Sequence, residues 1–197
     1  MILLYDQQTA IITLPKTGST ALFETLCRVP YRGVFCIGPS GNDPKYYDHH
    51  SIILPQAQFK WKVVVVVRHP LQRLVSLWAH MAKEQVMTFQ PITQLKHFVD
   101  AVANEWYEFY FYRSNQCDII KDLAYDYIIK NEFLEDHLIS LDILKHKGQL
   151  LSSNQFDPTI NSSTPKYQDV LTSEMIEKLK NWWEPDAKKF EYNIIYK

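Results

Sequence analysis

Residues that can bind an anion gather in one short turn, Leu14 to Thr20 (LPKTGST), between a predicted strand and a predicted helix. Gly18 allows the main chain to curl so that successive amide groups face inward, and the helix N-terminus adds positive potential. Lys16 supplies a full positive charge. Three side chains supply hydroxyl groups: Thr17, Ser19 and Thr20. The turn predicts a phosphate-binding loop. The alternative is an ordinary strand–turn–helix connection with a capping serine, because the Walker A pattern G-x-x-x-x-G-K-[ST] is absent.

A second group of candidates follows the apolar run Val63 to Val67. In a nucleotide triphosphatase such a strand often ends in an aspartate that holds magnesium, but here it ends in Arg68. An arginine cannot ligate a metal, whereas it can pair with a phosphate. Arg73 and Ser76 follow on one face of the next predicted helix. Ser76 either meets the same anion or is a small residue needed for packing, and Arg73 either contacts the ligand or forms a salt bridge that props the helix.

The elements that must position these residues alternate along the chain. A continuous β-branched run such as 61–68 is typical of a strand buried on both faces of a parallel sheet, and Pro70 suits the first position of a helix. The predicted strands cover 10–14, 33–36, 61–68 and 125–129. The predicted helices cover 19–28, 70–80, most of 92–123, 133–144 and, as one or two helices, 172–190. This alternation predicts an α/β fold. Two anion sites on adjacent strands, without a metal-binding acid, favour a ligand that carries phosphate at both ends.

Composition narrows the class of protein. The chain has 197 residues, no repeats and no long linker, which predicts a single domain over 1–197. The net charge of −1 argues against nucleic-acid binding driven by bulk charge. The three cysteines are odd in number and lack metal-type spacing, which favours a reducing compartment. Because the start of the chain lacks a signal-peptide pattern and no apolar run is long enough to span a membrane, we expect a soluble, cytoplasmic protein.

These motifs resemble those of the sulfotransferases that use 3′-phosphoadenosine 5′-phosphosulfate. Residues 15–20 look like the loop that binds the 5′-phosphosulfate, and residues 68–76 (RHPLQRLVS) are similar to the 3′-phosphate motif R-x-P-x-x-R-x-x-S. The likeness is closest to the carbohydrate and heparan-type branch, which has a histidine segment like 48–51 (DHHS) and an aromatic tail like 186–192 (DAKKFEY). The sequence departs from many relatives at His69, where they have aspartate or asparagine.

The resemblance implies a P-loop-like three-layer α/β fold, with a central, mostly parallel sheet flanked by helices. It implies a transferase that moves a sulfuryl group in line from the donor nucleotide to an acceptor hydroxyl, on a glycan or a small molecule, and leaves 3′,5′-diphosphoadenosine. Lys16 then neutralises the departing phosphate, and Arg68 and Ser76 bind the 3′-phosphate. The remaining donor-binding residues are Thr17, Gly18, Ser19 and Thr20. No metal, nucleic acid or membrane is expected to take part, and the oligomeric state is left open.

The acceptor hydroxyl must lose its proton, and a histidine within hydrogen-bond reach is the usual base. His49 matches the histidine of the family, and His50 is the alternative because a shift of one residue in a loop exchanges them. A zinc site is disfavoured, since no third ligand has suitable spacing. Two other functions stay open: a P-loop kinase for a nucleotide or small molecule, and a nucleotide-binding module without catalysis.

Overall fold

The computed structural model describes residues 1–28, 34–36, 60–84, 94–104, 114–150 and 164–196. The chain forms two compact units. The first, which we call the sheet unit, comprises residues 1–68 and 122–162, and the second, the helical unit, comprises residues 69–121 and 163–197. That the whole chain, 1–197, acts as one domain stays a prediction.

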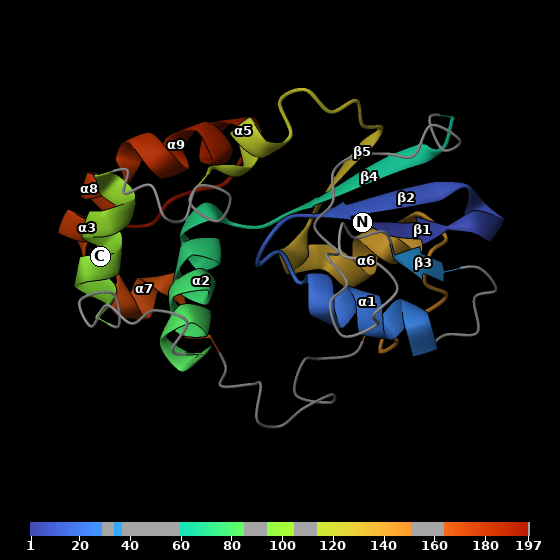
Figure 1. The fold of residues 1–197 in the computed structure, drawn as a ribbon, viewed down its shortest axis with the longest axis horizontal. Coiled ribbons are helices and arrows are strands. Elements are labelled where there is room, and N and C mark those ends of the chain that lie inside the picture. Colours follow the sequence, from blue (N-terminus) through green and yellow to red (C-terminus); the bar gives the residue numbers. More distant parts are fainter. Residues whose placement is uncertain (29–33, 37–59, 85–93, 105–113, 151–163, 197) are drawn as a thin grey trace. The chain divides into compact units, whose positions relative to one another are not determined.

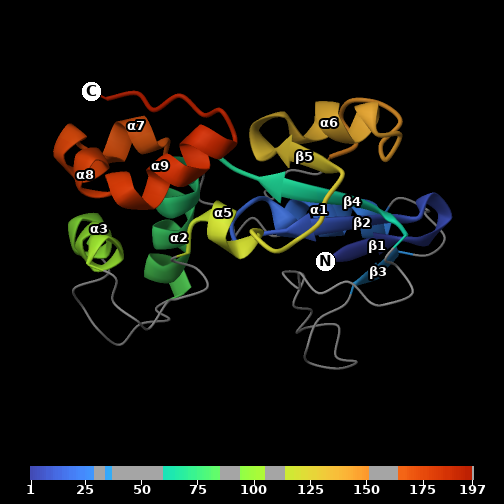
Figure 2. The same ribbon diagram turned by 90° about the horizontal axis from the view of Figure 1, so that it is seen from above.

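The sheet unit contains a five-stranded sheet with the order β3-β1-β2-β4-β5, and Figure 2 shows the strands side by side in this order. The strands are β1 (Ile2–Leu4), β2 (Thr9–Thr13), β3 (Val34–Cys36), β4 (Lys62–Val67) and β5 (Tyr127–Lys130). The pairs β2–β4 and β4–β5 are parallel, whereas β1 is antiparallel to both β2 and β3. Four strands therefore run in one direction and β1 runs against them, which confirms the predicted mostly parallel sheet.

Strand β4 lies between β2 and β5, and its valines are buried on both faces of the sheet. One face carries α1 (Ser19–Arg28) and α6 (Leu134–Ser140), and leucines of both helices pack with Val64 and Val66. Each such side chain contributes roughly 1.5–3 kcal/mol on full burial. Burial of both faces, with helices flanking the sheet, confirms the α/β class and agrees with a P-loop-like arrangement (Figure 1).

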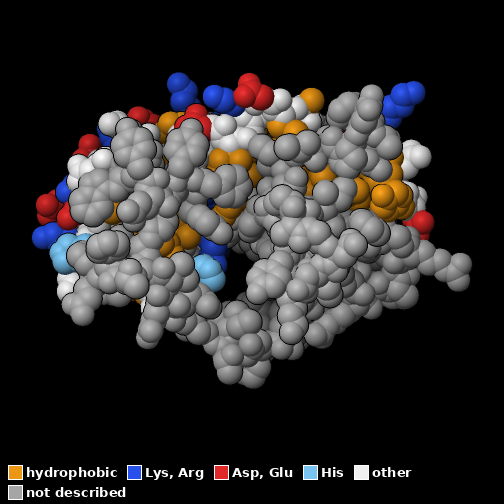
Figure 3. Space-filling model, viewed as in Figure 1, with side chains coloured by type: hydrophobic (Ala, Val, Ile, Leu, Met, Phe, Trp, Pro, Cys, Tyr) orange, Lys and Arg blue, Asp and Glu red, His pale blue; other side chains and the backbone are white. Residues whose placement is uncertain are grey.

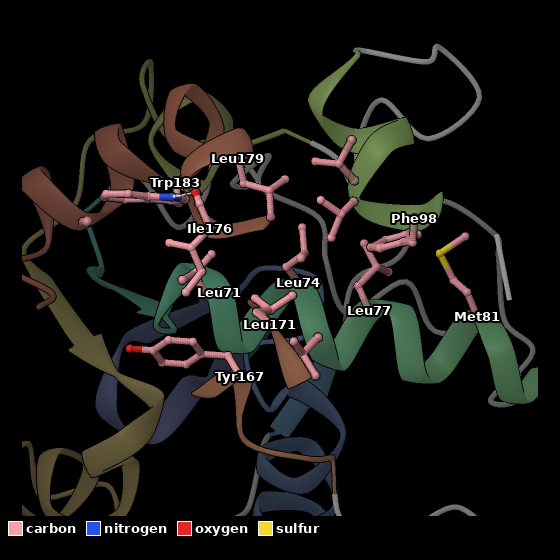
Figure 4. Close-up of a cluster of buried hydrophobic side chains, with 14 residues drawn as sticks. Leu71, Leu74, Leu77, Met81, Phe98, Tyr167, Leu171, Ile176, Leu179 and Trp183 are labelled. Atoms are coloured by element: carbon pink, nitrogen blue, oxygen red, sulfur yellow. Dashed lines mark hydrogen bonds between the residues drawn. The ribbon is translucent and has the colours of Figure 1, made fainter. Parts of the chain in front are cut away.

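The helical unit is built around α2 (Pro70–Glu84). Its other helices are α3 (Leu95–Ala103), α5 (Gln116–Ile119), α7 (Tyr167–Val170), α8 (Ser173–Lys178) and α9 (Lys180–Lys189). Figure 4 shows Leu71 and Leu74 of α2 pointing toward Ile176 and Leu179, and all four side chains are buried. The indole N–H of Trp183 donates to the carbonyl of Ile176 at 2.8 Å, so this core also satisfies its polar group.

Lysine and arginine side chains alternate with aspartate and glutamate side chains along the edge formed by α3, α8 and α9 (Figure 3). One such pair is Lys178 and Asp100, 2.6 Å apart. This mixture of signs agrees with the small net charge of the chain.

Among the residues that the structure describes, no helix has both the length and the apolar character needed to cross a membrane.

Most predicted elements are confirmed, with a few differences, one of which is that the short helix α7 was not predicted. The predicted 133–144 helix is shorter: it consists of the 3₁₀ turn η6 (Asn131–Phe133) and α6, and the chain leaves the helix before Asp142, whose φ is +58°. The predicted helical stretch 92–123 contains α3 and the short α5 in its described part. Strand β1 was not predicted, because three apolar residues at a chain end carry no periodicity. A 3₁₀ turn, η1 (Tyr5–Gln7), connects it to β2.

Candidate functional site

The turn after β2 has the backbone of an anion-binding loop. Lys16 and Gly18 both have left-handed φ values, +64° and +88°. Thr17 between them is buried, and both its N–H and its hydroxyl donate to the carbonyl of Leu14, at 3.2 and 2.7 Å. Alternation of the sign of φ along consecutive residues makes their amide groups converge, which creates a concave site for an anion.

The carbonyl groups of this loop are held by other parts of the sheet unit. Arg68 Nη1 donates to the carbonyl of Lys16 at 3.0 Å, and Asn131 Nδ2 donates to the carbonyl of Thr17 at 2.9 Å. The carbonyl of Gly18 accepts the first main-chain bond of α1, from Leu22 N–H at 3.1 Å. Because the amide groups at the start of a helix lack partners within it, the N–H groups of the first turn of α1 are suited to bind an anion.

Gly18 cannot be exchanged for another residue without local rearrangement. A Cβ atom at this position would lie 2.3 Å from Asn131 Nδ2 and 3.8 Å from Leu134 Cδ2. In addition, its φ of +88° is unfavourable for any residue with a side chain. Glycine was predicted to be needed here for its conformation, and the close approach of Asn131 is a second reason for a glycine at position 18.

Arg68 reaches the loop because of the parallel register of the sheet. Thr13 of β2 is opposite Val66 of β4, so Arg68 is level with the first residues of the turn. The carboxyl ends of β2 and β4 thus bring Arg68 beside Lys16. Hence the structure places the predicted loop residues and Arg68 together: Lys16, Thr17, Gly18, Ser19, Thr20 and Arg68. Their ligand-binding roles stay predictions.

Arg73 and Ser76 lie on α2 in the helical unit, and both are buried. Arg73 is 2% exposed, and its Nη1 donates to the carbonyl of Ser114 at 2.9 Å. Its Cζ lies 5.9 Å from the centroid of the Trp182 ring. Burial lowers the pKa of Arg73 to about 10, and the charge of Asp186 opposes that shift. These contacts support the interpretation that Arg73 props the helix. Ser76 is 7% exposed, and its role at the 3′-phosphate stays a prediction.

Asp186 is a fully buried carboxylate that sequence analysis noticed only as part of a tail motif. It accepts from the main-chain and side-chain nitrogens of Gln116 at 2.8 and 2.9 Å, and from the N–H of Cys117 at 2.8 Å. Burial and the neighbouring Asp186 raise the pKa of the Cys117 thiol to about 12. This thiol therefore stays protonated at neutral pH and is unsuited to act as a nucleophile.

Three further histidines were singled out from the sequence: His49, His50 and His69. His49 and His50 lie outside the described residues, so the predicted base stays a prediction. His69 departs from the family pattern. Its ring stacks on the ring of Tyr167, with centroids 4.6 Å apart, and packs edge-on against the ring of Tyr192, with centroids 5.2 Å apart. Its Nε2 lies 3.2 Å from the carbonyl oxygen of Asn193. The described ranges contain no group of three metal-ligating side chains.

Asn131 is the loop-contacting residue that sequence reasoning missed. It follows β5 directly, and β5 is parallel to β4, so Asn131 occupies the same edge of the sheet as Arg68. A polar residue immediately after a parallel strand was the available signal.

Comparison with models of protein families matches residues 5–193 to the model described as "Sulfotransferase family". Comparisons with curated proteins and with solved structures give no match. The matched range includes the loop, Arg68, Ser76 and the histidine segment.

Proposed function

Because this chain belongs to the sulfotransferase family, we propose that it transfers a sulfuryl group from 3′-phosphoadenosine 5′-phosphosulfate to an acceptor hydroxyl. The observation that carries the choice of donor is the contact between Arg68 and the anion loop, with Nη1 3.0 Å from the Lys16 carbonyl. It brings a second cationic side chain to the edge of a loop already suited to one phosphate. A nucleotide phosphorylated on both its 3′ and 5′ oxygens can use both groups.

The donor set of the site fits phosphate oxygens. The loop offers an anion the N–H groups of Gly18 to Thr20 and the hydroxyls of Ser19 and Thr20, and Lys16 and Arg68 add two cations. In our proposal the residues Lys16 to Thr20 bind the 5′-phosphosulfate and Arg68 binds the 3′-phosphate. The role that we propose for Ser76, binding of the 3′-phosphate, rests on the R-x-P-x-x-R-x-x-S resemblance alone.

When bound, the donor supplies a sulfuryl group attached to its 5′-phosphate oxygen. Lys16 stabilises the negative charge that develops on that oxygen as its bond to sulfur breaks, and the N–H groups from Gly18 to Thr20 assist. His49, or His50 in the other loop register, accepts the proton of the acceptor hydroxyl as the new oxygen–sulfur bond forms. Neutralising charge at one end of the transfer and removing a proton at the other both lower the barrier.

We propose a glycan or small-molecule hydroxyl as the acceptor, with the glycan first because of the resemblance to the carbohydrate branch. We also propose that the protein works in a reducing compartment, the cytoplasm, because its number of cysteines is odd. The free thiol of Cys117 agrees with this proposal.

Arg68→Ala is expected to weaken binding of 3′,5′-diphosphoadenosine by roughly 10–100-fold, the effect of losing a hydrogen bond between charged groups. Calorimetric titration measures this affinity. Arg68→Lys retains the charge without the two-pronged geometry and should recover part of the loss. Unchanged affinity in Arg68→Ala would refute the assignment of Arg68 to the donor.

His49→Ala is expected to reduce turnover by roughly 10²–10⁴-fold with little change in donor affinity, because a base acts on the acceptor. His50→Ala provides the matched control, since the two residues are adjacent. A turnover loss in His50→Ala alone would transfer the role to His50, whereas normal turnover in both variants would exclude this histidine segment as the base.

The proposed function is tested by incubating the protein with sulfur-labelled donor and a panel of hydroxyl acceptors in the presence of a metal chelator. We expect label to appear in an acceptor, and 3′,5′-diphosphoadenosine, but not ATP, to raise the melting temperature. Phosphoryl transfer from ATP that requires magnesium would favour the kinase alternative. Donor binding without transfer to any acceptor would favour a non-catalytic module.

A further inference from the structure

Asn131 contacts the anion loop from a distant part of the sequence. Its Nδ2 donates to the carbonyl of Thr17 at 2.9 Å, across 114 positions of sequence. The residue is half-buried and directly follows β5, whose register places Lys130 opposite Val67 of β4. The sheet therefore fixes the main chain of Asn131, so its short side chain has a fixed point from which to reach the loop.

This hydrogen bond sets the orientation of one peptide group. In the described part of the chain every peptide bond is trans, so the N–H of Gly18 points away from the Thr17 carbonyl and hence away from Asn131. Arg68 holds the preceding carbonyl, that of Lys16, in a similar way. Two consecutive carbonyls are thus anchored to the sheet, and the Gly18 N–H is turned to the opposite side.

The Thr17–Gly18 peptide needs such an anchor. Glycine adopts positive and negative φ with similar ease, so Gly18 itself offers little resistance to rotation of the peptide group. After such a rotation the Thr17 carbonyl would replace the Gly18 N–H and present a partial negative charge to an anion. Asn131 also lies where a Cβ atom of residue 18 would be, so the flexible glycine is the residue that permits this close contact.

We propose that Asn131 is a positioning residue for anion binding, which holds the Thr17 carbonyl so that the Gly18 N–H faces the phosphate. This inference rests on the proposed function, because it assumes that the loop binds the 5′-phosphate end of the donor. Asn131 makes no contact with the ligand in this account and acts through Gly18.

The Gly18 amide can be observed alone. The pair Thr–Gly occurs once in the sequence, at residues 17 and 18, so labelling threonine carbonyl carbon and glycine nitrogen selects a single NMR signal. In the wild-type protein we expect this signal to shift strongly when 3′,5′-diphosphoadenosine is added. In Asn131→Ala most of that shift should disappear, and affinity should fall about tenfold, as for one lost hydrogen bond to a charged ligand.

Asn131→Asp is the second variant, because it preserves the shape of the side chain and removes its donor. It should lose the Gly18 response as Asn131→Ala does, with a larger loss of affinity from the added negative charge. Asn115→Ala is the matched control: Asn115 accepts from the N–H of Asp118 at 2.8 Å as the cap of α5, so its removal destabilises a helix without touching the loop. Its Gly18 response and affinity should equal those of the wild type.

The outcomes separate the inference from the function on which it rests. A wild-type protein that does not bind the nucleotide, or binds it without a shift of Gly18, contradicts the proposed function of the loop. A wild-type response that persists unchanged in both Asn131 variants overturns the positioning role alone. Loss of affinity with a normal Gly18 shift also overturns it, because the loss would then arise by another route.

Discussion

Lys16→Met is expected to reduce sulfuryl transfer by roughly 10²–10³-fold, the usual effect of removing one group that stabilises charge in a transition state. Methionine has similar length and no charge, so the variant tests the ammonium group itself. The loss should fall mainly on turnover, because the charge that Lys16 meets is larger on the departing phosphate than on the bound donor. Steady-state rates measured with labelled donor give turnover and KM separately.

The backbone of Lys16 provides an internal check. Its φ of +64° is unfavourable for a residue with a side chain, by about 1–2 kcal/mol, so Lys16→Gly should be inactive and yet more stable than Lys16→Met. Lys62→Met is the matched control, since Lys62 is an exposed lysine at the opposite end of the sheet, over the Tyr127 ring at 5.8 Å. Wild-type turnover in Lys16→Met would contradict the role of this residue.

Asp186→Ala is expected to lower the free energy of unfolding by about 3–5 kcal/mol, as when one partner of a buried charged group is removed. The substitution leaves the three N–H donors from Gln116 and Cys117 without their acceptor and removes the charge that opposes the lowered pKa of Arg73. Asp186→Asn keeps one acceptor oxygen and should lose less. Urea unfolding followed by circular dichroism measures the effect.

Asp100→Ala provides the comparison for Asp186. Asp100 pairs with Lys178 at 2.6 Å on the surface, with 31% of the Asp100 side chain exposed, so its loss should cost no more than about 1 kcal/mol. If Asp186→Ala were as mild as Asp100→Ala, the buried network around Arg73 would not be important for the stability of the helical unit.

The sequence predicted those parts of the site whose residues lie close together along the chain. The strand–loop–helix around Gly18 and the placement of Arg68 after a valine-rich strand follow from short motifs, and the parallel register then brings them together. Asn131 and Asp186 were not assigned, because their partners are distant in sequence and a hydrogen bond across 114 or 70 positions leaves no periodic signal. The structural role of Arg73 became clear only from its burial.

The central claim is that the loop at Lys16 to Thr20 and Arg68 bind the two ends of one nucleotide. Calorimetric titration of the wild-type protein with 3′,5′-diphosphoadenosine and with adenosine 5′-phosphate, in chelator, tests it most directly. We expect the doubly phosphorylated nucleotide to bind roughly 10–100-fold more tightly, because its 3′-phosphate can pair with Arg68. Equal affinity for the two nucleotides would contradict the account.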